Sequence, residues 1–248
     1  MTRALNLLSL LSATLLLAPH AAAQGGSWPT VHQQATWLIT TIEHKVTPRT
    51  SLWFDGNWRR MGVGEEPQQA LLRPGILHTI APGVRIGGGY TYVATAPYGE
   101  VPLPTPVREH RIWQQLTFAH TAGPVAITHR YRWEQRWLAP VTSGGLGDFT
   151  YQQRARYMVR AQAPLGGLTL RGRAITGFAQ EELLLPVGHS GSVGRFTQNR
   201  FGVGAGLPLT GRQRLEIGYM NLWNAITWVP ANEVNHTVTL NWVITSGN

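Results

Sequence analysis

The segment THRYRWEQRW, residues Thr128–Trp137, decides the fold because its large aromatic and charged side chains strictly alternate. Successive side chains on a β-strand point to opposite faces, so a period of two predicts a strand with one aromatic and one charged face. The two parities are His129, Tyr131, Trp133, Gln135 and Trp137 on one side and Arg130, Arg132, Glu134 and Arg136 on the other. A membrane barrel accommodates both faces, with the aromatic parity toward lipid and the charged parity toward an aqueous lumen.

The same period of two recurs along the chain, as in Leu215–Tyr219 and Val238–Trp242. Many of the predicted strands exceed the usual length of about 5–6 residues in soluble proteins and match the 9–11 residues of a tilted membrane strand. Strands are predicted at 35–46, 50–60, 73–80, 84–95, 107–120, 125–138, 151–163, 168–180, 195–207, 212–224 and 234–245. A soluble β-sandwich is the alternative, since it would keep the alternation and bury the aromatic face in its core.

The predicted connections alternate between short turns rich in proline and glycine and longer links. Short turns are predicted at 47–49, 81–83, 121–124, 164–167 and 208–211, and long links at 61–72, 96–106, 139–150, 181–194 and 225–233. Short turns on one rim and long loops on the other are typical of a bacterial outer-membrane barrel. The fold class predicted is therefore all-β, an antiparallel up-and-down transmembrane barrel.

Strand direction bears on the strand count. If the short turns face the periplasm, the last predicted strand ends there and leaves the C-terminus in the periplasm. The first predicted strand also runs toward the periplasm, which would place the N-terminus outside the cell. Bacterial single-chain barrels have an even number of strands. The sequence therefore favours about twelve strands, with one further strand near Trp28–Gln34, over a barrel that closes irregularly.

The N-terminal residues resemble a secretory signal. Arg3 is followed by an apolar stretch over 5–18 and by Ala21–Ala23, a small-residue cleavage pattern. The prediction is a signal peptide over residues 1–23 and a single outer-membrane barrel domain over 24–248, exported to the cell outer membrane. The chain has no cysteine, which excludes disulfides and thiolate metal sites.

The composition is unusual for a soluble domain, with 13% charged residues, ten tryptophans and a formal net charge of +9. Basic proteins often bind nucleic acid or anionic surfaces. An exported chain rarely meets nucleic acid, so the predicted partners are outer-membrane lipid and small anions, and no nucleic acid.

Five segments in order also resemble the domain-of-unknown-function family 2490. They are EHRIWQQ (109–115), HRYRWEQRW (129–137), RARYMVRAQAPL (154–165), NRFGVGAGLPL (199–209) and LEIGYM (215–220). The resemblance covers about residues 35–245 and implies an outer-membrane-barrel-like fold. It implies no catalytic residues, because the family has no agreed activity.

Projecting the charged parity inward predicts an arginine-rich network in the lumen. Arginine stays charged and offers a planar fork of donors to partners on flanking strands. The network comprises Glu109, Arg111, Arg130, Arg132, Glu134, Arg136, Arg154, Arg156, Arg160, Arg171, Arg173, Arg200, Arg214 and Glu216, with Gln115 and Gln198 beside them. Either these groups brace a filled barrel, or the arginine excess makes an anion path or anion-binding cavity.

A lipid- or lipopolysaccharide-modifying enzyme is the third class of function. His110 and His129 are candidates by residue type, but both share the apolar parity, and His189-Ser190 falls in a long loop. His32, His44, His78, His120 and His236 are scattered and show no metal-ligand spacing. The glycines at 86–90 and 202–206 lack the Lys-Ser/Thr of a phosphate loop, so close packing in a curved sheet explains them better. No catalytic residue, cofactor or metal is predicted.

Overall fold

The computed structural model describes residues 28–188, 197–226 and 229–247, which are strands and their connections without a helix. In particular, this part of the chain has no helix long and apolar enough to cross a membrane. The predicted signal peptide lies outside the described residues. The strands are β1 (Thr30–Lys45), β2 (Thr50–Met61), β3 (Glu66–Ala81), β4 (Val84–Thr95), β5 (Val107–Ala122), β6 (Val125–Thr142), β7 (Gly145–Leu146), β8 (Thr150–Leu170), β9 (Arg173–Val187), β10 (Gln198–Pro208), β11 (Gln213–Ile226) and β12 (Ala231–Gly247).

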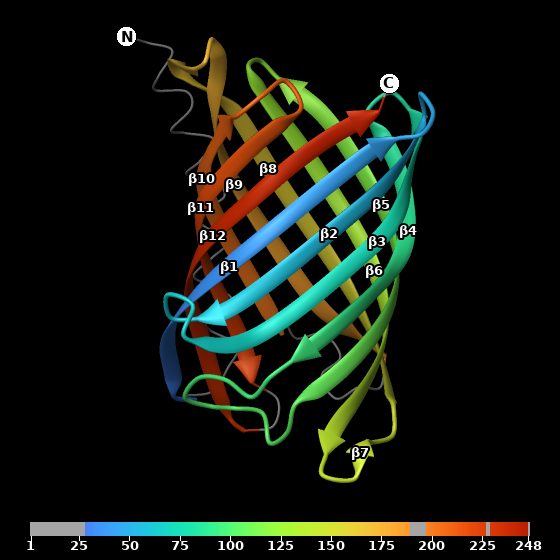
Figure 1. The fold of residues 1–248 in the computed structure, drawn as a ribbon, viewed down its shortest axis with the longest axis vertical. Coiled ribbons are helices and arrows are strands. Elements are labelled where there is room, and N and C mark those ends of the chain that lie inside the picture. The colour runs from blue at the N-terminus through green and yellow to red at the C-terminus, as the bar shows by residue number, and fades with distance from the viewer. Residues whose placement is uncertain (1–27, 189–196, 227–228, 248) are drawn as a thin grey trace.

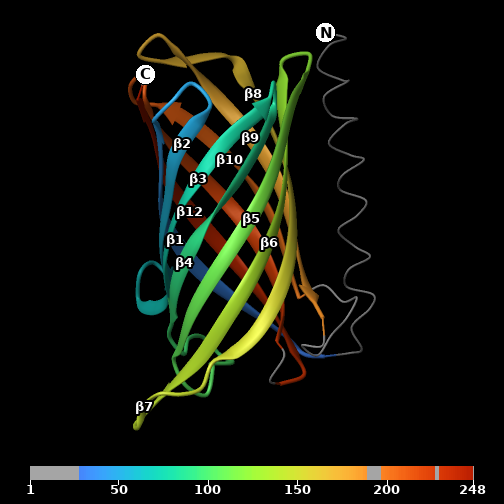
Figure 2. The same ribbon diagram turned by 90° about the vertical axis from the view of Figure 1, so that its right-hand side faces the viewer.

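These strands form one closed barrel in which neighbours in sequence pair antiparallel (Figures 1 and 2). β1 and β12 close the wall, and they pair parallel from Thr30 with Asn232 to Lys45 with Gly247. The two-residue strand β7 pairs only with the end of β6 and lies outside the wall. The soluble sandwich is therefore wrong, because one sheet closes on itself.

The predicted count of twelve barrel strands is also wrong, since eleven form the wall. β1 itself begins at Thr30, so the segment near Trp28–Gln34 extends the first strand and adds no new one. In an up-and-down barrel an odd count places the first and last strands in the same direction, which is why the closing pair is parallel. Irregular closure, the alternative to a missing strand, is what the structure shows.

Several predicted connections are shorter than expected because the strands run further. β3 begins at Glu66, so only residues 62–65 link it to β2, and β11 and β12 are separated only by 227–230. The proline and glutamates at 65–67 resemble a loop, but a β-bulge between Arg59 and Arg60 takes up the extra residue Gln68. β9 likewise continues through Val187, which converts the start of the predicted link 181–194 into strand.

The predicted turn at 164–167 is wrong. These residues belong to β8, and their glycines mark an interruption of pairing between Pro164 and Thr169. The chain reverses instead at Arg171 and Gly172, whose φ angles are 53° and 73°. Two consecutive positive φ values are those of a tight hairpin turn, for which glycine is favoured at the second position.

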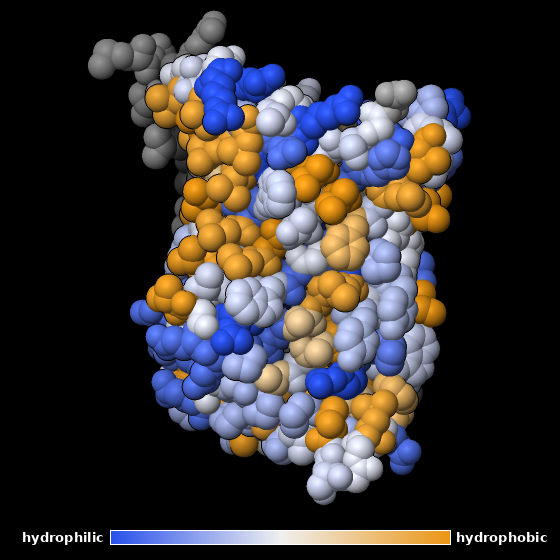
Figure 3. Space-filling view, in the orientation of Figure 1, coloured by the Kyte–Doolittle hydropathy of each residue, from blue (hydrophilic) through white to orange (hydrophobic). Residues whose placement is uncertain are grey.

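Inward and outward faces follow the parities of the sequence. On β6, Tyr131 is 50% exposed whereas Arg132 and Glu134 are buried. Apolar side chains on alternate positions of the other strands are likewise exposed on the outer wall. Figure 3 shows hydrophobic side chains spread over the upper and middle part of the face containing β1, β11 and β12, with hydrophilic ones at the upper edge and again toward the lower end. The outer wall is thus largely apolar, and the interior holds charged side chains together with a buried apolar cluster of Ala35, Trp37, Met61, Met220 and Leu222.

Glycine makes room for the largest inward side chain. Trp113 is 1% exposed, and a Cβ added to Gly89 would lie 2.7 Å from its Cζ2 and 2.7 Å from the Cα of Gly75. Gly89→Val is expected to lower the free energy of unfolding by about 1–3 kcal/mol, the usual cost of overpacking. Gly144→Val is the control, because its nearest atom would be 3.8 Å away. Equal urea midpoints for both variants would contradict this packing.

Candidate functional site: a buried ionic cluster and the adjoining cavity

Alternation places charged side chains from most of the wall strands on the inner wall, where they meet across strand boundaries. Glu134 on β6 lies directly opposite Arg154 on β8. Directly opposite pairs also join like charges, namely Arg132 with Arg156 and Arg111 with Arg136. Each like-charged pair therefore depends on carboxylates that reach it from neighbouring positions.

Glu134 is the most deeply buried of these carboxylates, with 0% exposure. It accepts hydrogen bonds from Arg154 Nε at 2.9 Å and Nη2 at 2.5 Å, and from Arg156 Nη1 at 2.8 Å. Arg111 Nη1 lies 3.9 Å away. One carboxylate thus lies close to three guanidinium groups and holds two of them, Arg154 and Arg156, by charge-assisted hydrogen bonds.

Glu182 on β9 plays the same part for a second group of arginines. It accepts hydrogen bonds from Arg130 at 2.7 Å, from Arg156 at 2.7 and 2.8 Å, and from Arg200 at 3.4 Å. Arg156 therefore joins Glu182 to Glu134. The result is one continuous ionic cluster that runs across β6, β8, β9 and β10.

Three further carboxylates also form ion pairs on the inner wall. Glu109 binds Arg111 and Arg136, each through a closest contact of 2.5 Å. Glu216 lies 2.9 Å from both Arg160 and Arg214. Asp55 on β2 lies 3.2 Å from Arg73 on β3. The ionic cluster is defined below as the inner-wall residues of these pairs: Asp55, Arg73, Glu109, Arg111, Arg130, Glu134, Arg136, Arg154, Arg156, Arg160, Glu182, Arg200, Arg214 and Glu216.

Two buried arginines have no carboxylate partner among the described residues. Arg132 is held by Gln115 Oε1 at 2.6 and 3.1 Å, and its guanidinium carbon lies 4.7 Å from the Trp113 ring centroid. Arg59 donates to Gln69 Oε1 at 2.7 Å and stacks 3.7 Å above Trp37. Aromatic faces and amide oxygens stabilise these cations without neutralising them.

A cavity of about 930 Å³ adjoins the ionic cluster on the side of the longer connections. Arginines of the cluster line its inner end, and Leu103 and Val229 from the connections line its outer end. Tyr98, in the link between β4 and β5, also lines it, and burial together with the Glu233 carboxylate raises the pKa of its hydroxyl. That hydroxyl therefore stays neutral. The cavity volume falls in the range of small-molecule sites.

The structure brings together most of the network residues named from the sequence, and it leaves two apart. Arg171 lies in the β8–β9 turn and donates to the Leu209 carbonyl at 3.2 Å. Arg173, the first residue of β9, is exposed and lines a separate cavity of about 230 Å³ at the short-turn rim. Neither makes an ion pair with a described carboxylate.

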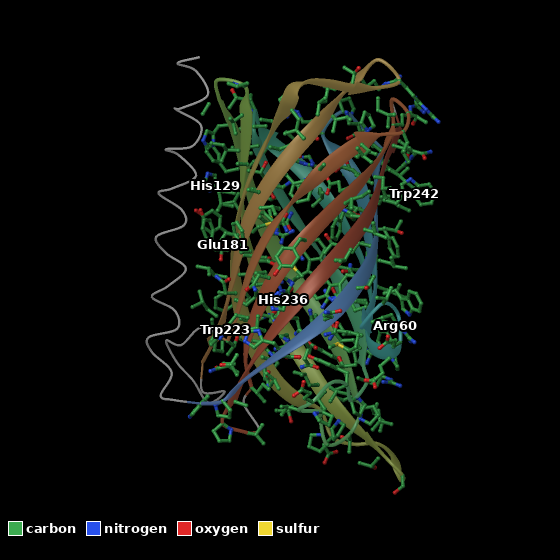
Figure 4. All side chains as sticks on the ribbon, turned by 90° about the vertical axis from the view of Figure 1, so that its left-hand side faces the viewer. Arg60, His129, Glu181, Trp223, His236 and Trp242 are labelled. Carbon is green, nitrogen blue, oxygen red and sulfur yellow. The ribbon has the colours of Figure 1, made fainter. Side chains whose placement is uncertain are left out.

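Sequence reasoning missed Asp55, Arg59, Arg73 and Glu182. Glu182 was assigned to a loop, although Phe178, Gln180 and Glu182 continue the inward parity of β9. In Arg59-Arg60 and Glu181-Glu182 two charged residues are adjacent, so apolar and charged residues do not alternate there. One charged residue of each pair points outward. Figure 4 shows Arg60 and Glu181 on the outer side of the wall.

The candidate histidines lie on the outer surface and pair with tyrosines. His110 Nδ1 contacts the Tyr90 hydroxyl, and His129 Nδ1 lies 2.9 Å from the Tyr157 hydroxyl. His44 Nδ1 lies 2.9 Å from Ser246 Oγ at the short-turn rim, but no described carboxylate orients that ring. His189 and Ser190 are outside the described residues. Within the described ranges, no three potential metal-ligating side chains converge.

Comparison with known proteins places this architecture in a family. Residues 34–227 match the model of a family described as a protein of unknown function, DUF2490. An uncharacterized protein of Methylorubrum extorquens is 27% identical over 238 residues, which cover 94% of this chain and 95% of the relative. The match to the family model extends from within β1 to the end of β11. The chain therefore belongs to the DUF2490 family.

Proposed function

We propose that this protein is an outer-membrane barrel, exported by a cleaved signal peptide, whose bore is braced and closed by the ionic cluster. The observation that carries the proposal is the burial of the charged groups at mid-bore. Arg132, Glu134 and Arg156 are 3%, 0% and 6% exposed. Side chains so excluded from solvent fill the space that an open channel would need for water and ions.

Support for the membrane setting comes from the outer wall. Ile86, Leu116 and Tyr131 form a row across β4, β5 and β6, paired in register, and all three are exposed. Contiguous apolar exposure on this scale is costly in water and favourable in lipid. All eleven wall strands have at least the 11 residues of β10, which satisfies the length of a tilted membrane strand.

The outward histidine pairs are consistent with this setting. Tyr219 OH lies 2.6 Å from His236 Nδ1, which repeats the arrangement of Tyr90 with His110 and Tyr157 with His129. Amphipathic aromatic rings are favoured at membrane interfaces, where one end is apolar and the other is polar. Pairing their polar tips removes the cost of an unsatisfied group near lipid.

The short-turn rim is proposed to face the periplasm and the cavity mouth to face outward. The C-terminal end of β12 lies at the short-turn rim (Figure 1). The links at the opposite rim include the longer β4–β5 connection, residues 96–106, and the β6–β8 connection that carries β7. Long extracellular loops and short periplasmic turns are the arrangement of bacterial barrels.

Planar lipid bilayers test whether the bore is closed. The wild-type protein is expected to give no conductance steps, with insertion verified by protease protection of the same vesicles. A triple variant, Arg132→Ala, Glu134→Ala and Arg156→Ala, is expected to conduct because it removes three buried side chains that fill the bore. Steady anion-selective conductance of the wild type would show an open channel and contradict the closed barrel.

A further inference from the structure

Arg59 is a buried cation whose hydrogen-bonding capacity is not used up. Its side chain donates to Gln69 Oε1 at 2.7 Å and to Asn57 Oδ1 at 3.4 Å. Its Nε has no partner among the described atoms, although the residue is only 9% exposed. A buried donor without an acceptor costs free energy, and more so when it is charged.

The electrostatic surroundings of Arg59 make this cost larger. Arg73, Arg111 and Arg200 line the same cavity as Arg59. Asp55 is itself engaged by Arg73 at 3.2 Å. Arg200 shares the Trp37 ring with Arg59, since its guanidinium carbon lies 5.4 Å from the ring centroid. This corner of the inner wall therefore holds several cations and little negative charge.

The same corner forms part of the wall of the cavity of about 930 Å³. Arg59, Arg73 and Arg200 line it, and an anion bound there would supply the charge that the wall lacks. Toward the mouth, apolar side chains join the lining, namely Leu103, Leu138, Ile226 and Val229, beside amides such as Gln153 and Asn232. A pocket with cations at one end and apolar side chains at the other suits a small organic anion.

We propose that this cavity binds an organic anion, a carboxylate or phosphate monoester that carries an apolar body. The anionic group lies against the Arg59 guanidinium, and the apolar body extends toward Leu103 and Val229. A guanidinium suits both anions because its planar donors match their oxygens. The cavity lies on the loop side of the ionic cluster, so binding does not depend on whether the bore is closed.

Titration calorimetry of the full chain in a non-ionic detergent tests the site with defined probes. Phenyl phosphate and benzoate are expected to bind saturably. Benzyl alcohol, which lacks the anionic group, and inorganic phosphate, which lacks the apolar body, are expected to bind about tenfold or more weakly. Dihexanoyl phosphatidate distinguishes the source of the ligand. Tighter binding than phenyl phosphate identifies a lipid-derived anion, and equal or weaker binding identifies a soluble one.

Arg59→Gln is the decisive variant, and it is expected to weaken phenyl phosphate binding by about tenfold or more. It removes a cation without a carboxylate partner, so the fold should persist, and an unchanged unfolding midpoint verifies this. Arg85→Gln is the matched control, because Arg85 is paired with Glu43 at 2.6 Å and does not line the cavity. Should Arg59→Gln bind as the wild type does, or should no probe bind the wild type, the site is not an anion site. Equal binding of benzyl alcohol would likewise overturn it.

Discussion

Replacing Glu134 with glutamine is expected to lower the free energy of unfolding by about 3–5 kcal/mol, the cost of removing one partner from a buried ionic group. Glu134 is completely buried and compensates Arg154 and Arg156, with Arg111 nearby. Glutamine has nearly the same shape, so the loss comes from the charge and from turning an acceptor into a donor that faces other donors. Urea unfolding in detergent micelles, followed by tryptophan fluorescence, measures the difference.

Two companion variants make this result specific. Glu43→Gln removes one carboxylate of a partly exposed pair with Arg85, whose side chains are 24% and 32% exposed, and should cost no more than about 1 kcal/mol. The double variant Glu134→Gln with Arg154→Gln should recover part of the loss, because it removes a cation along with its partner. If Glu134→Gln were no more harmful than Glu43→Gln, the cluster would not brace the barrel.

Placing an arginine on the outer wall is expected to have the next largest effect. Leu116→Arg should lower stability in lipid vesicles by about 2–4 kcal/mol if the position lies near the bilayer midplane. Leu116 is exposed and lies between Ile86 and Tyr131 in register, so in lipid a charge there has no polar partner. Folding in vesicles, measured by resistance to denaturation on unheated gels, gives the result.

Val63→Arg provides the comparison, because Val63 is 88% exposed in the link between β2 and β3. A rim substitution should change stability by no more than about 0.5 kcal/mol. If the barrel is a membrane protein, the folded wild-type chain is also expected to need detergent or lipid to remain in solution. A monodisperse folded protein in plain buffer, with Leu116→Arg as harmless as Val63→Arg, would refute it.

The sequence predicted the wall well because the inward and outward alternation is a local property of each strand. Tyr131 and Arg132 show this, since adjacent residues of one strand lie on opposite faces whatever the neighbouring strand contributes. Predictions weakened where the local signal was mixed. The paired charges at Glu181-Glu182 hid the second half of β9, and the prolines and glycines near 62–67 and 164–167 resembled turns although strands continue past them.

Strand number and partner choice are properties of the whole sheet. No single segment shows that β1 and β12 meet in parallel, because closure depends on how all the strands are staggered around the barrel. Stagger also decides which charges meet. Arg156 lies opposite Leu184 in register, yet its carboxylate partner on β9 is Glu182, reached diagonally.

The amino-acid sequence by itself determined that this chain builds β-strands with one apolar face and one arginine-rich face. The reason is that successive side chains along a strand point to opposite faces. Only the tertiary structure decided that Glu134 and Glu182 collect the arginines into one cluster, and that Arg59 is left beside a cavity without a carboxylate partner. The physical reason is that ion pairing requires approach within about 4 Å, and that distance depends on the register between strands far apart in sequence.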